Sequence, residues 1–478
     1  MNSTDKSVDT RYSVTFDQGT LLLQCPSTQH HSQRDHLAEQ FGDGVWTWDD
    51  RVAAWRCEAF HYRNVITTLW RQKLPYLDEA SQWEHIEWPG VEIHSPRPEQ
   101  AKAIQQWMED KRGVVVMPTG TGKTEVALHL LAKTQCSTLI VSPVRDLMYQ
   151  WHRRIKLGLR YDAGIIGDNT FNVRPVSVTT YDSAAIHAAK LGDRFKLVVF
   201  DECHHLPGNF RRDAATMSIA PWRLGLTATL IRSDGKHADL ESLIGPVVYE
   251  LKIAAVKGKA LADFDVIKIP VHLSAEEQFR YDTDSLKVKT FVRERLQTDA
   301  GFRWEDLCSE SARDPIARDV LVAFRSKQAI EDRAEEKLRV LEDLFRLHAG
   351  TPIIVFAGSN AMARDVSIRF LIPSMLNHCG KKERFEILQG LADGTYPAIV
   401  ANQVLDEGVD VPTVKVAIVI GGSSSTRQAK QRLGRVLRKS GNSRAILYEV
   451  VCMDTGEEKR SRKRRKSDAY ERTRHRRV

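Results

Sequence analysis

The chain has 478 residues, 42% hydrophobic and 28% charged, so it has room for about two to four domains and the composition of a globular protein. Its seven cysteines include no C-x-x-C pair, which argues against a disulfide framework and against a zinc or iron–sulfur site. No apolar run is long enough to cross a bilayer, and the first residues lack the apolar core of a secretory signal, so we expect a cytoplasmic protein without membrane contact.

The net charge of +8 is concentrated at one end of the chain. Residues 457–478 contain 11 Lys and Arg against 4 Asp and Glu, which leaves the rest nearly neutral. Because like charges repel, we expect residues 456–478 to form a disordered basic tail. Such a tail suits the backbone of a nucleic acid or a nuclear-import signal, and a merely solubilising end is the alternative.

Residues 1–92 are predicted to form a small α+β domain. The runs 12–16 and 20–24 flank Asp17-Gln18-Gly19 and predict a β-hairpin. Six of the ten tryptophans lie in this region among arginines. That pattern suits base stacking on a nucleic acid, but a small core also needs large side chains, and we favour the core.

A second domain is predicted over residues 93–257. It follows a proline-containing linker at 89–98, and a helix is expected to begin near Arg97 and Gln100. The amide of Gln100 presents a donor and an acceptor together, which suits the edge of an adenine.

The residues after the apolar run 114–116 predict a phosphate-binding loop. The segment Met117-Pro-Thr-Gly-Thr-Gly-Lys-Thr124 leads into a helix-compatible stretch, the context that gives such a loop physical meaning. The pattern asks for glycine where Met117 stands. Lys123 is expected to reach the β- and γ-phosphates of ATP, and the Thr124 hydroxyl to bind Mg²⁺. The residues assigned to nucleotide binding here are Thr119, Gly120, Thr121, Gly122, Lys123 and Thr124.

Short apolar runs at 138–142, 196–200 and 223–226 alternate with helix-length segments, which predicts a parallel α/β sheet. Asp201 and Glu202 follow one of these runs directly. We expect Asp201 to hold Mg²⁺ and Glu202 to orient or deprotonate water. His204 is a candidate link to a second domain, and Thr227 and Thr229 follow the next strand.

A third domain is predicted over residues 258–455. A strand at 264–273 precedes a charged region, about 275–349, read as a solvated helical insertion with a nucleic-acid contact as second choice. Further strands are expected at 352–357, 398–401, 414–420 and 444–451. Arg435 and Arg438 lie three residues apart on a predicted helix, as arginine fingers would, and a solvated basic helix is the alternative.

Several of these segments together resemble a superfamily two helicase. The ordered set is RPEQ, PTGTGKT, SPVRDLMYQW, TTYD, DECHH, LTAT, VLDEGVD and QRLGRVLR. Pieces such as LGDRFKLVVFDECHHLPG and NQVLDEGVDVP are similar to the XPB (xeroderma pigmentosum group B) DNA helicases in their short prokaryotic form. The resemblance covers nearly the whole chain.

The resemblance implies two RecA-like domains with ATP between them, 3′ to 5′ translocation on DNA and a role in nucleotide excision repair. It identifies residues 1–92 with the family's damage-recognition domain and about 275–349 with its thumb. The family's Arg-Glu-Asp triplet corresponds to Arg232-Ser233-Asp234, which lacks the central carboxylate. Further residues carried over are Arg145 and Thr180 at the DNA strand, and Asp410 and Gln431 at the nucleotide.

The hypothesis from the sequence is an ATP-dependent helicase or translocase acting as a monomer on single-stranded or forked DNA, with a repair nuclease as a candidate partner. Three alternatives stay open. They are a double-strand translocase that does not separate strands, an RNA helicase, and a DNA-binding clamp gated by ATP.

Overall fold

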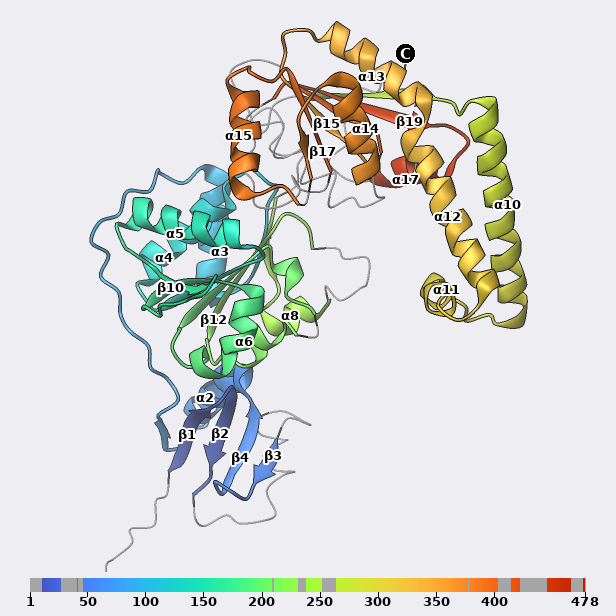
Figure 1. Cartoon of the computed structure of the whole chain (residues 1–478). Helices are drawn as coiled ribbons and strands as arrows, with labels where there is room; N and C mark the ends of the chain where they lie inside the picture. Colours follow the sequence, from blue (N-terminus) through green and yellow to red (C-terminus); the bar gives the residue numbers. More distant parts are fainter. Residues whose placement is uncertain are drawn as a thin grey trace, which may run out of the picture. The chain divides into compact units, whose positions relative to one another are not determined.

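The computed structural model describes residues 11–26, 41, 46–208, 210–230, 238–251, 264–376, 378–402, 414–421, 445–465 and 476–477. The chain divides into two compact units, Met1–Leu251 and Lys252–Val478 (Figure 1). Among the described helices, none is both long and apolar enough to cross a membrane.

The first unit begins with a five-stranded sheet in the order β3-β4-β2-β1-β5. Its elements are β1 (Tyr12–Asp17), β2 (Thr20–Gln24), β3 (Thr47–Asp49), β4 (Ala54–Glu58), the 3-10 turn η1 (Ala59–His61), α2 (Tyr62–Arg71) and β5 (Tyr76–Asp78). β1 and β2 pair antiparallel, so the predicted hairpin is confirmed. Trp46 and Trp55 are buried in its core, whereas Trp70 is 70% exposed. The tryptophans here therefore serve mainly as core, as favoured from the sequence.

The second sheet of this unit has eight strands in the order β13-β6-β12-β11-β7-β10-β8-β9. Its pairs are parallel except for the β8–β9 hairpin. The strands are β6 (Arg112–Val116), β7 (Thr138–Ser142), β8 (Gly164–Gly167), β9 (Thr170–Phe171), β10 (Val176–Thr180), β11 (Leu197–Asp201), β12 (Trp222–Thr227) and β13 (Val247–Glu250). The valine- and leucine-rich runs of β6, β7, β10, β11 and β12 are buried on both faces, as the centre of a parallel sheet requires, whereas the edge strands β13 and β9 are more exposed.

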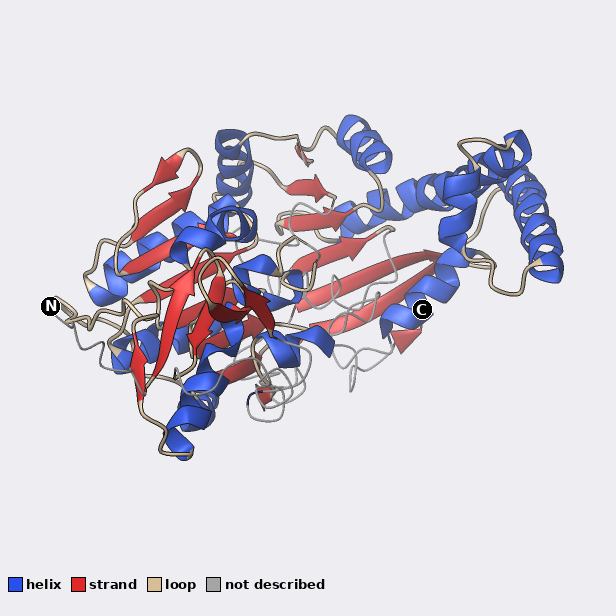
Figure 2. Cartoon of the chain, turned by 90° about the horizontal axis from the view of Figure 1, so that it is seen from below, coloured by secondary structure: helices blue, strands red, loops and turns tan. Residues whose placement is uncertain are grey.

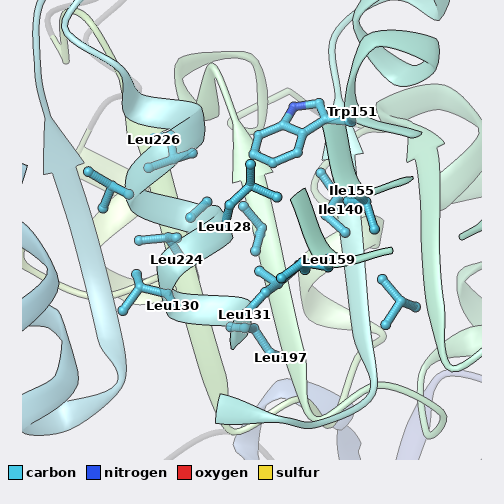
Figure 3. Close-up of a cluster of buried hydrophobic side chains, with 14 of the residues drawn as sticks. Leu128, Leu130, Leu131, Ile140, Trp151, Ile155, Leu159, Leu197, Leu224 and Leu226 are labelled. Carbon is cyan, nitrogen blue, oxygen red and sulfur yellow. The ribbon is translucent and has the colours of Figure 1, made fainter. Parts of the chain in front are cut away.

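Helices cover both faces of this sheet. α3 (Pro98–Asp110), α4 (Lys123–Thr134) and α5 (Arg145–Leu159) pack on one face, in the core cluster of Figure 3. The cluster on the other face takes residues from α6 (Tyr181–Leu191), α7 (Asp213–Thr216) and α8 (Asp239–Leu243), with the turn η2 (Cys203–His205) beside them. The predicted doubly covered α/β domain is thereby confirmed.

The segment between the two sheets of the first unit is packed along the second sheet. The Ser137 N–H donates to the carbonyl of Glu84 over 2.9 Å, and the Ile86 N–H donates to that of Gln135 over 2.9 Å. The Glu92 N–H donates to the carbonyl of Gly158 over 2.7 Å. The contact of Glu92 falls within the predicted linker 89–98, whereas Glu84 and Ile86 precede it, so residues 84–92 run along this sheet before α3 begins (Figure 1).

The second unit contains a seven-stranded parallel sheet in the order β16-β17-β15-β18-β19-β14-β20. Its strands are β14 (Phe264–Val271), β15 (Ile353–Phe356), β16 (Ser374–Met375), β17 (Ala398–Ala401), β18 (Val416–Val419), β19 (Ala445–Cys452) and β20 (Arg476–Arg477). Helices α13 (Glu335–Leu347), α14 (Asn360–Phe370) and α15 (Lys381–Ala392) pack on this sheet. The predicted second α/β block is confirmed.

The predicted helical insertion consists of α10 (Ala275–Thr298), α11 (Trp304–Glu310) and α12 (Pro315–Arg333). α10 and α12 lie side by side, away from the strands of their own sheet, in both views (Figures 1 and 2). α13 falls within the predicted insertion of about 275–349 but packs Leu341 and Leu344 into the core of the sheet, so the predicted insertion was too long. We call α10–α12 the arm.

The expectation of a disordered tail from residue 456 was wrong for its first ten residues. Gly456–Arg465 form the helix α17, packed on β19. Glu457 is fully buried against Lys337 at 2.8 Å, and Arg460 pairs with Glu331. The sequence of this segment shows mainly like charges that repel one another. The residues that pair with Glu457 and Arg460, namely Lys337 and Glu331, lie more than 100 positions earlier in the chain. Residues 466–475 lie outside the described part.

The two sheets of the first unit meet closely at Gly192, the residue that ends α6. A Cβ at this position would overlap the Met217 carbonyl oxygen and the ring of Phe16 from β1. Ile219, from the second sheet's side, completes the core of the N-terminal sheet.

We expect Gly192→Ala to destabilise the protein by about 1–3 kcal/mol, because the added methyl group must push these elements apart. Urea unfolding followed by tryptophan fluorescence measures the change. Gly208→Ala is the matched control, since a Cβ there meets nothing within 4 Å. Equal stability of the two variants would contradict the tight contact at Gly192.

Candidate active site

The polar residues predicted from the sequence converge at one edge of the eight-stranded sheet. β6, β12 and β11 are parallel neighbours, so their carboxyl ends lie together. The loop after β6 leads to Lys123, β11 ends at Asp201, and β12 ends at Thr227. Crevices outside the carboxyl ends of parallel strands are where ligands bind in open α/β sheets.

The loop between β6 and α4 has the backbone of an anion cradle. Gly120 and Gly122 have φ angles of +82° and +84°, and Gly122 caps the N-terminus of α4. A Cβ at Gly122 would also overlap the amide of Gln100, so glycine is required there for space as well as for conformation. The helix start then presents backbone N–H groups toward an anion.

Lys123 is 9% exposed, and its ammonium group lies between the loop and the acids. Its Nζ donates to the carbonyl of Met117 over 3.2 Å and lies 3.8 Å from Oε1 of Glu202. Met117, which replaces the glycine of the usual pattern, is fully buried, and its N–H donates to the Thr227 carbonyl over 3.0 Å. The methionine side chain therefore belongs to the core, and the loop uses only its backbone.

Arg97 and Gln100 support this loop from α3. The Gln100 side chain accepts from the Arg97 N–H over 2.8 Å and donates to the Thr121 carbonyl over 3.0 Å. The Arg97 guanidinium donates to the same carbonyl. In this structure both residues thus hold the shape of the loop, and reading of an adenine edge by Gln100 stays a prediction.

Asp201 is 7% exposed and is held from both sides. Trp151 Nε1 donates to its Oδ2 over 2.8 Å, and the Glu202 N–H donates to its Oδ1 over 3.0 Å. Burial, with the neighbouring Glu202 carboxylate, raises the pKa of Asp201 to about 6, although the Trp151 hydrogen bond and Lys123 oppose this rise. The sequence did not identify Trp151 as part of this site, because helical periodicity accounts for it as a core residue.

Glu202 has a left-handed backbone, with a φ angle of +46°. Such strain in a residue other than glycine is typical of functional sites. Its Oε2 lies 3.5 Å from Nδ1 of the fully buried His204, and the same nitrogen lies 2.9 Å from the hydroxyl of Thr227. That hydroxyl donates to the carbonyl of Thr229 over 2.8 Å. A chain of polar contacts therefore joins the second carboxylate to the loop after β12.

The two residues carried over as DNA contacts lie at the starts of α5 and α6, which follow the adjacent strands β7 and β10 on the same sheet edge. Arg145 begins α5 and is paired with Asp168 of the β8–β9 turn at 2.6 Å. Tyr149 donates to the same carboxylate over 2.9 Å. Thr180 caps α6 by accepting the Ser183 N–H over 3.3 Å. The Thr180 side chain therefore stabilises the start of α6 in this structure.

Several predicted site residues are not covered by these observations. Outside the described residues lie Arg232, Asp234, Asp410, Gln431, Arg435 and Arg438. Their proposed roles in strand separation and nucleotide binding remain predictions from the sequence.

Three family models match successive parts of the chain. Residues 14–80 match the xeroderma pigmentosum group B helicase damage recognition domain. Residues 93–232 match the res subunit of type III restriction enzymes, and residues 320–468 match the ERCC3/RAD25/XPB C-terminal helicase.

Among similar proteins is the DNA 3′-5′ translocase XPB2 of Sulfurisphaera tokodaii, 38% identical over 90% of this chain and 97% of that protein. The DNA 3′-5′ helicase XPB of Kineococcus radiotolerans is 31% identical over 75% of this chain, which spans 60% of that longer protein. The crystal structure of the Pyrococcus furiosus Hef helicase domain shares the fold, with a TM-score of 0.51 and 17% identity over 76% of this chain and 97% of that one.

The raised pKa of Asp201 gives a testable pH dependence in the absence of divalent cations. The ordinary pKa is 3.8, so between about pH 4 and pH 6 the folded state holds the proton more tightly than the unfolded state. Stability from this group is therefore lost as the pH rises through that window. We expect Asp201→Asn to stabilise the protein by about 1–2 kcal/mol at pH 7 and less at pH 4.5.

Thermal unfolding at both pH values, in buffer containing a chelator, measures this difference. Glu241→Gln, which changes an exposed carboxylate on α8, is the control. A destabilised Asp201→Asn variant at pH 7 would contradict the assigned direction of the pKa shift.

Proposed function

The chain belongs to the XPB family of helicases, and on this premise we propose that it is a DNA-stimulated ATPase that moves 3′ to 5′ along DNA and opens it. The direction and the nucleic acid come from the names of its relatives. The observation that carries the ATPase proposal is the convergence of Lys123, Asp201 and Glu202 at one sheet edge. A repair role, with a nuclease as a candidate partner, is the pathway we favour.

In the proposed reaction, the loop from Thr119 to Thr124 cradles the phosphates of ATP, and Lys123 neutralises charge on them. Glu202 lies beside Lys123 and orients the attacking water or takes its proton. His204 Nδ1 lies 3.5 Å from Glu202 Oε2, on the side of this carboxylate away from Lys123.

The oxygen atoms near the loop are suitable ligands for Mg²⁺. Thr124 offers a hydroxyl and Asp201 a carboxylate, the oxygen ligands that this cation prefers. Within the described part of the site, Asp201 and Glu202 bring two acidic groups against the single ammonium of Lys123. Bound Mg²⁺ would neutralise charge that develops on the phosphates.

The rest of the cycle is inferred from the family and from the sequence. Arg435 and Arg438 would approach the γ-phosphate as arginine fingers, with Asp410 and Gln431 at the nucleotide. The segments 142–151 and 179–182 would hold one DNA strand along its backbone. The contacts from Glu202 through His204 and Thr227 to Thr229 offer a route from hydrolysis to the loop that precedes Arg232 and Asp234.

A double-strand translocase that leaves strands paired is the main competing activity, because serine replaces the central acid of the Arg232-Ser233-Asp234 triplet. Displacement of a third strand from a triplex without displacement of a duplex strand would favour it. An RNA helicase would be stimulated by RNA alone.

Lys123→Ala should lower DNA-stimulated ATP turnover by at least about 100-fold, since it removes a fixed positive charge from the reacting phosphates. ATP hydrolysis is measured with no nucleic acid, single-stranded DNA, duplex, fork and RNA. Turnover that survives this substitution would remove the ATPase proposal.

Glu202→Gln separates the motor from an ATP-gated clamp. It keeps the size of the side chain, and we expect ATP binding to persist while hydrolysis falls by at least about 100-fold. DNA opening that continues undiminished in this variant would favour the clamp.

Arg145→Gln tests the proposed DNA edge. Loss of one phosphate contact should weaken binding to all sequences and reduce the slope of log affinity against log salt by about 1. Fluorescence anisotropy at several salt concentrations measures the slope. Lys190→Gln, at the opposite end of α6, is the control, and an unchanged slope for Arg145→Gln would exclude this contact.

A further inference from the structure

The arm is a separately packed lever on the second unit. Val288 and Phe291 of α10 pack with Leu307 of α11 and Val320 of α12 in a cluster distinct from the core of the sheet. α10 has 24 residues, so its axis is about 36 Å long. A force on the far end of the arm is transmitted to the start of α10 and the end of α12, which we call its base.

The base of the arm is fastened to α17 through Glu331, a fully buried residue of α12. Its Oε1 accepts from the hydroxyl of Tyr281 in α10 over 2.8 Å and from the Gly456 N–H over 2.9 Å. Its Oε2 is paired with Arg460. One carboxylate thus ties both long helices of the arm to the C-terminal helix.

A second buried ion pair continues from α17 to the sheet. Lys337 of α13 and Glu457 of α17 are both 0% exposed and lie 2.8 Å apart. Lys337 also donates to the carbonyl of Ile420, just past the end of β18, over 2.9 Å. Glu457 accepts the N–H of Cys452, the last residue of β19, over 2.9 Å. The carboxyl edge of the second sheet is therefore part of the same network.

Such pairs are poorly explained by stability alone. Removing two charges from water costs several kcal/mol per ion, and well-packed apolar residues often serve as well. In some proteins a buried pair fixes one geometry, because each charge must find its partner. The four charged residues and Tyr281 are placed where they could fix the angle between the arm and the sheet in this way.

We propose that this network, which we call the joint, is the mechanical connection through which the arm and the carboxyl edge of the second sheet move together. Its members are Tyr281, Glu331, Lys337, Glu457 and Arg460. They are positioning residues for the motor step. This inference rests on the proposed translocase function. It predicts that a protein whose joint is weakened hydrolyses ATP but moves less DNA for each ATP.

The test uses two variants of the full chain. Tyr281→Phe removes only the hydroxyl that bridges Glu331 and Gly456. The double variant Glu331→Gln/Arg460→Met removes both charges of the pair between the partly exposed Arg460 and the buried Glu331, so that neither is left without its partner. Arg462→Met is the matched control, because it breaks an exposed pair with Glu458 on the same helix.

Two quantities are measured. Hydrogen exchange is followed in peptides of α10, α12 and α17, with β15 as internal reference. Triplex strand displaced per ATP hydrolysed is then determined on DNA. In the joint variants we expect exchange at the base of the arm to rise about tenfold, and displacement per ATP to fall about two- to thirtyfold while DNA-stimulated hydrolysis continues.

Unchanged exchange, or the same change in Arg462→Met, would overturn the joint. A proportional fall of hydrolysis and displacement, which leaves their ratio unchanged, would overturn its mechanical role. If the wild-type chain hydrolyses ATP on DNA but displaces nothing, the proposed translocase function fails instead, and the exchange measurement alone then decides whether the joint exists.

Discussion

Two adjacent carboxylates buried beside a lysine at the carboxyl end of β11 are the constraint on which the first unit depends. Ionised groups are costly to bury, so every neighbour must contribute to holding them. Trp151 donates to Asp201, Tyr181 donates to its backbone carbonyl, and His204 faces Glu202. These three residues come from α5, α6 and η2, so helices on both faces of the sheet are held in register with the acids. The left-handed backbone of Glu202 shows that this arrangement carries conformational strain at that residue.

Buried charge has a different use in the second unit. Around α17 the ions are paired at the junction between the arm and the seven-stranded sheet. The first unit has an excess of acid, two carboxylates beside one ammonium group, which a bound cation would offset. At the junction each of the acids Glu331 and Glu457 is paired with a base of the same chain. The same physical cost thus supports chemistry in one unit and fixed geometry in the other.

Local pattern explains most of what could be predicted. Strands such as Thr138–Ser142 and Ala398–Ala401 are continuous apolar runs, and the glycines of the phosphate loop reveal its turn directly. Long-range pairing explains what was missed. Whether Trp151 meets Asp201, or whether Gln100 turns its amide to the loop, depends on neighbours 50 and 21 residues away. The helix of Gly456–Arg465 has its counter-charges on α12 and α13, so its own composition pointed to disorder.

The seam between the two sheets of the first unit has a consequence for synthesis. Ile219 completes the core of the N-terminal sheet, whose last strand ends at Asp78. A ribosome that adds about 5–20 residues per second would reach this isoleucine roughly 7–28 s after it has made that strand. During this interval the nascent sheet holds an unfilled position in its apolar interior, a natural point for a chaperone to engage the growing chain.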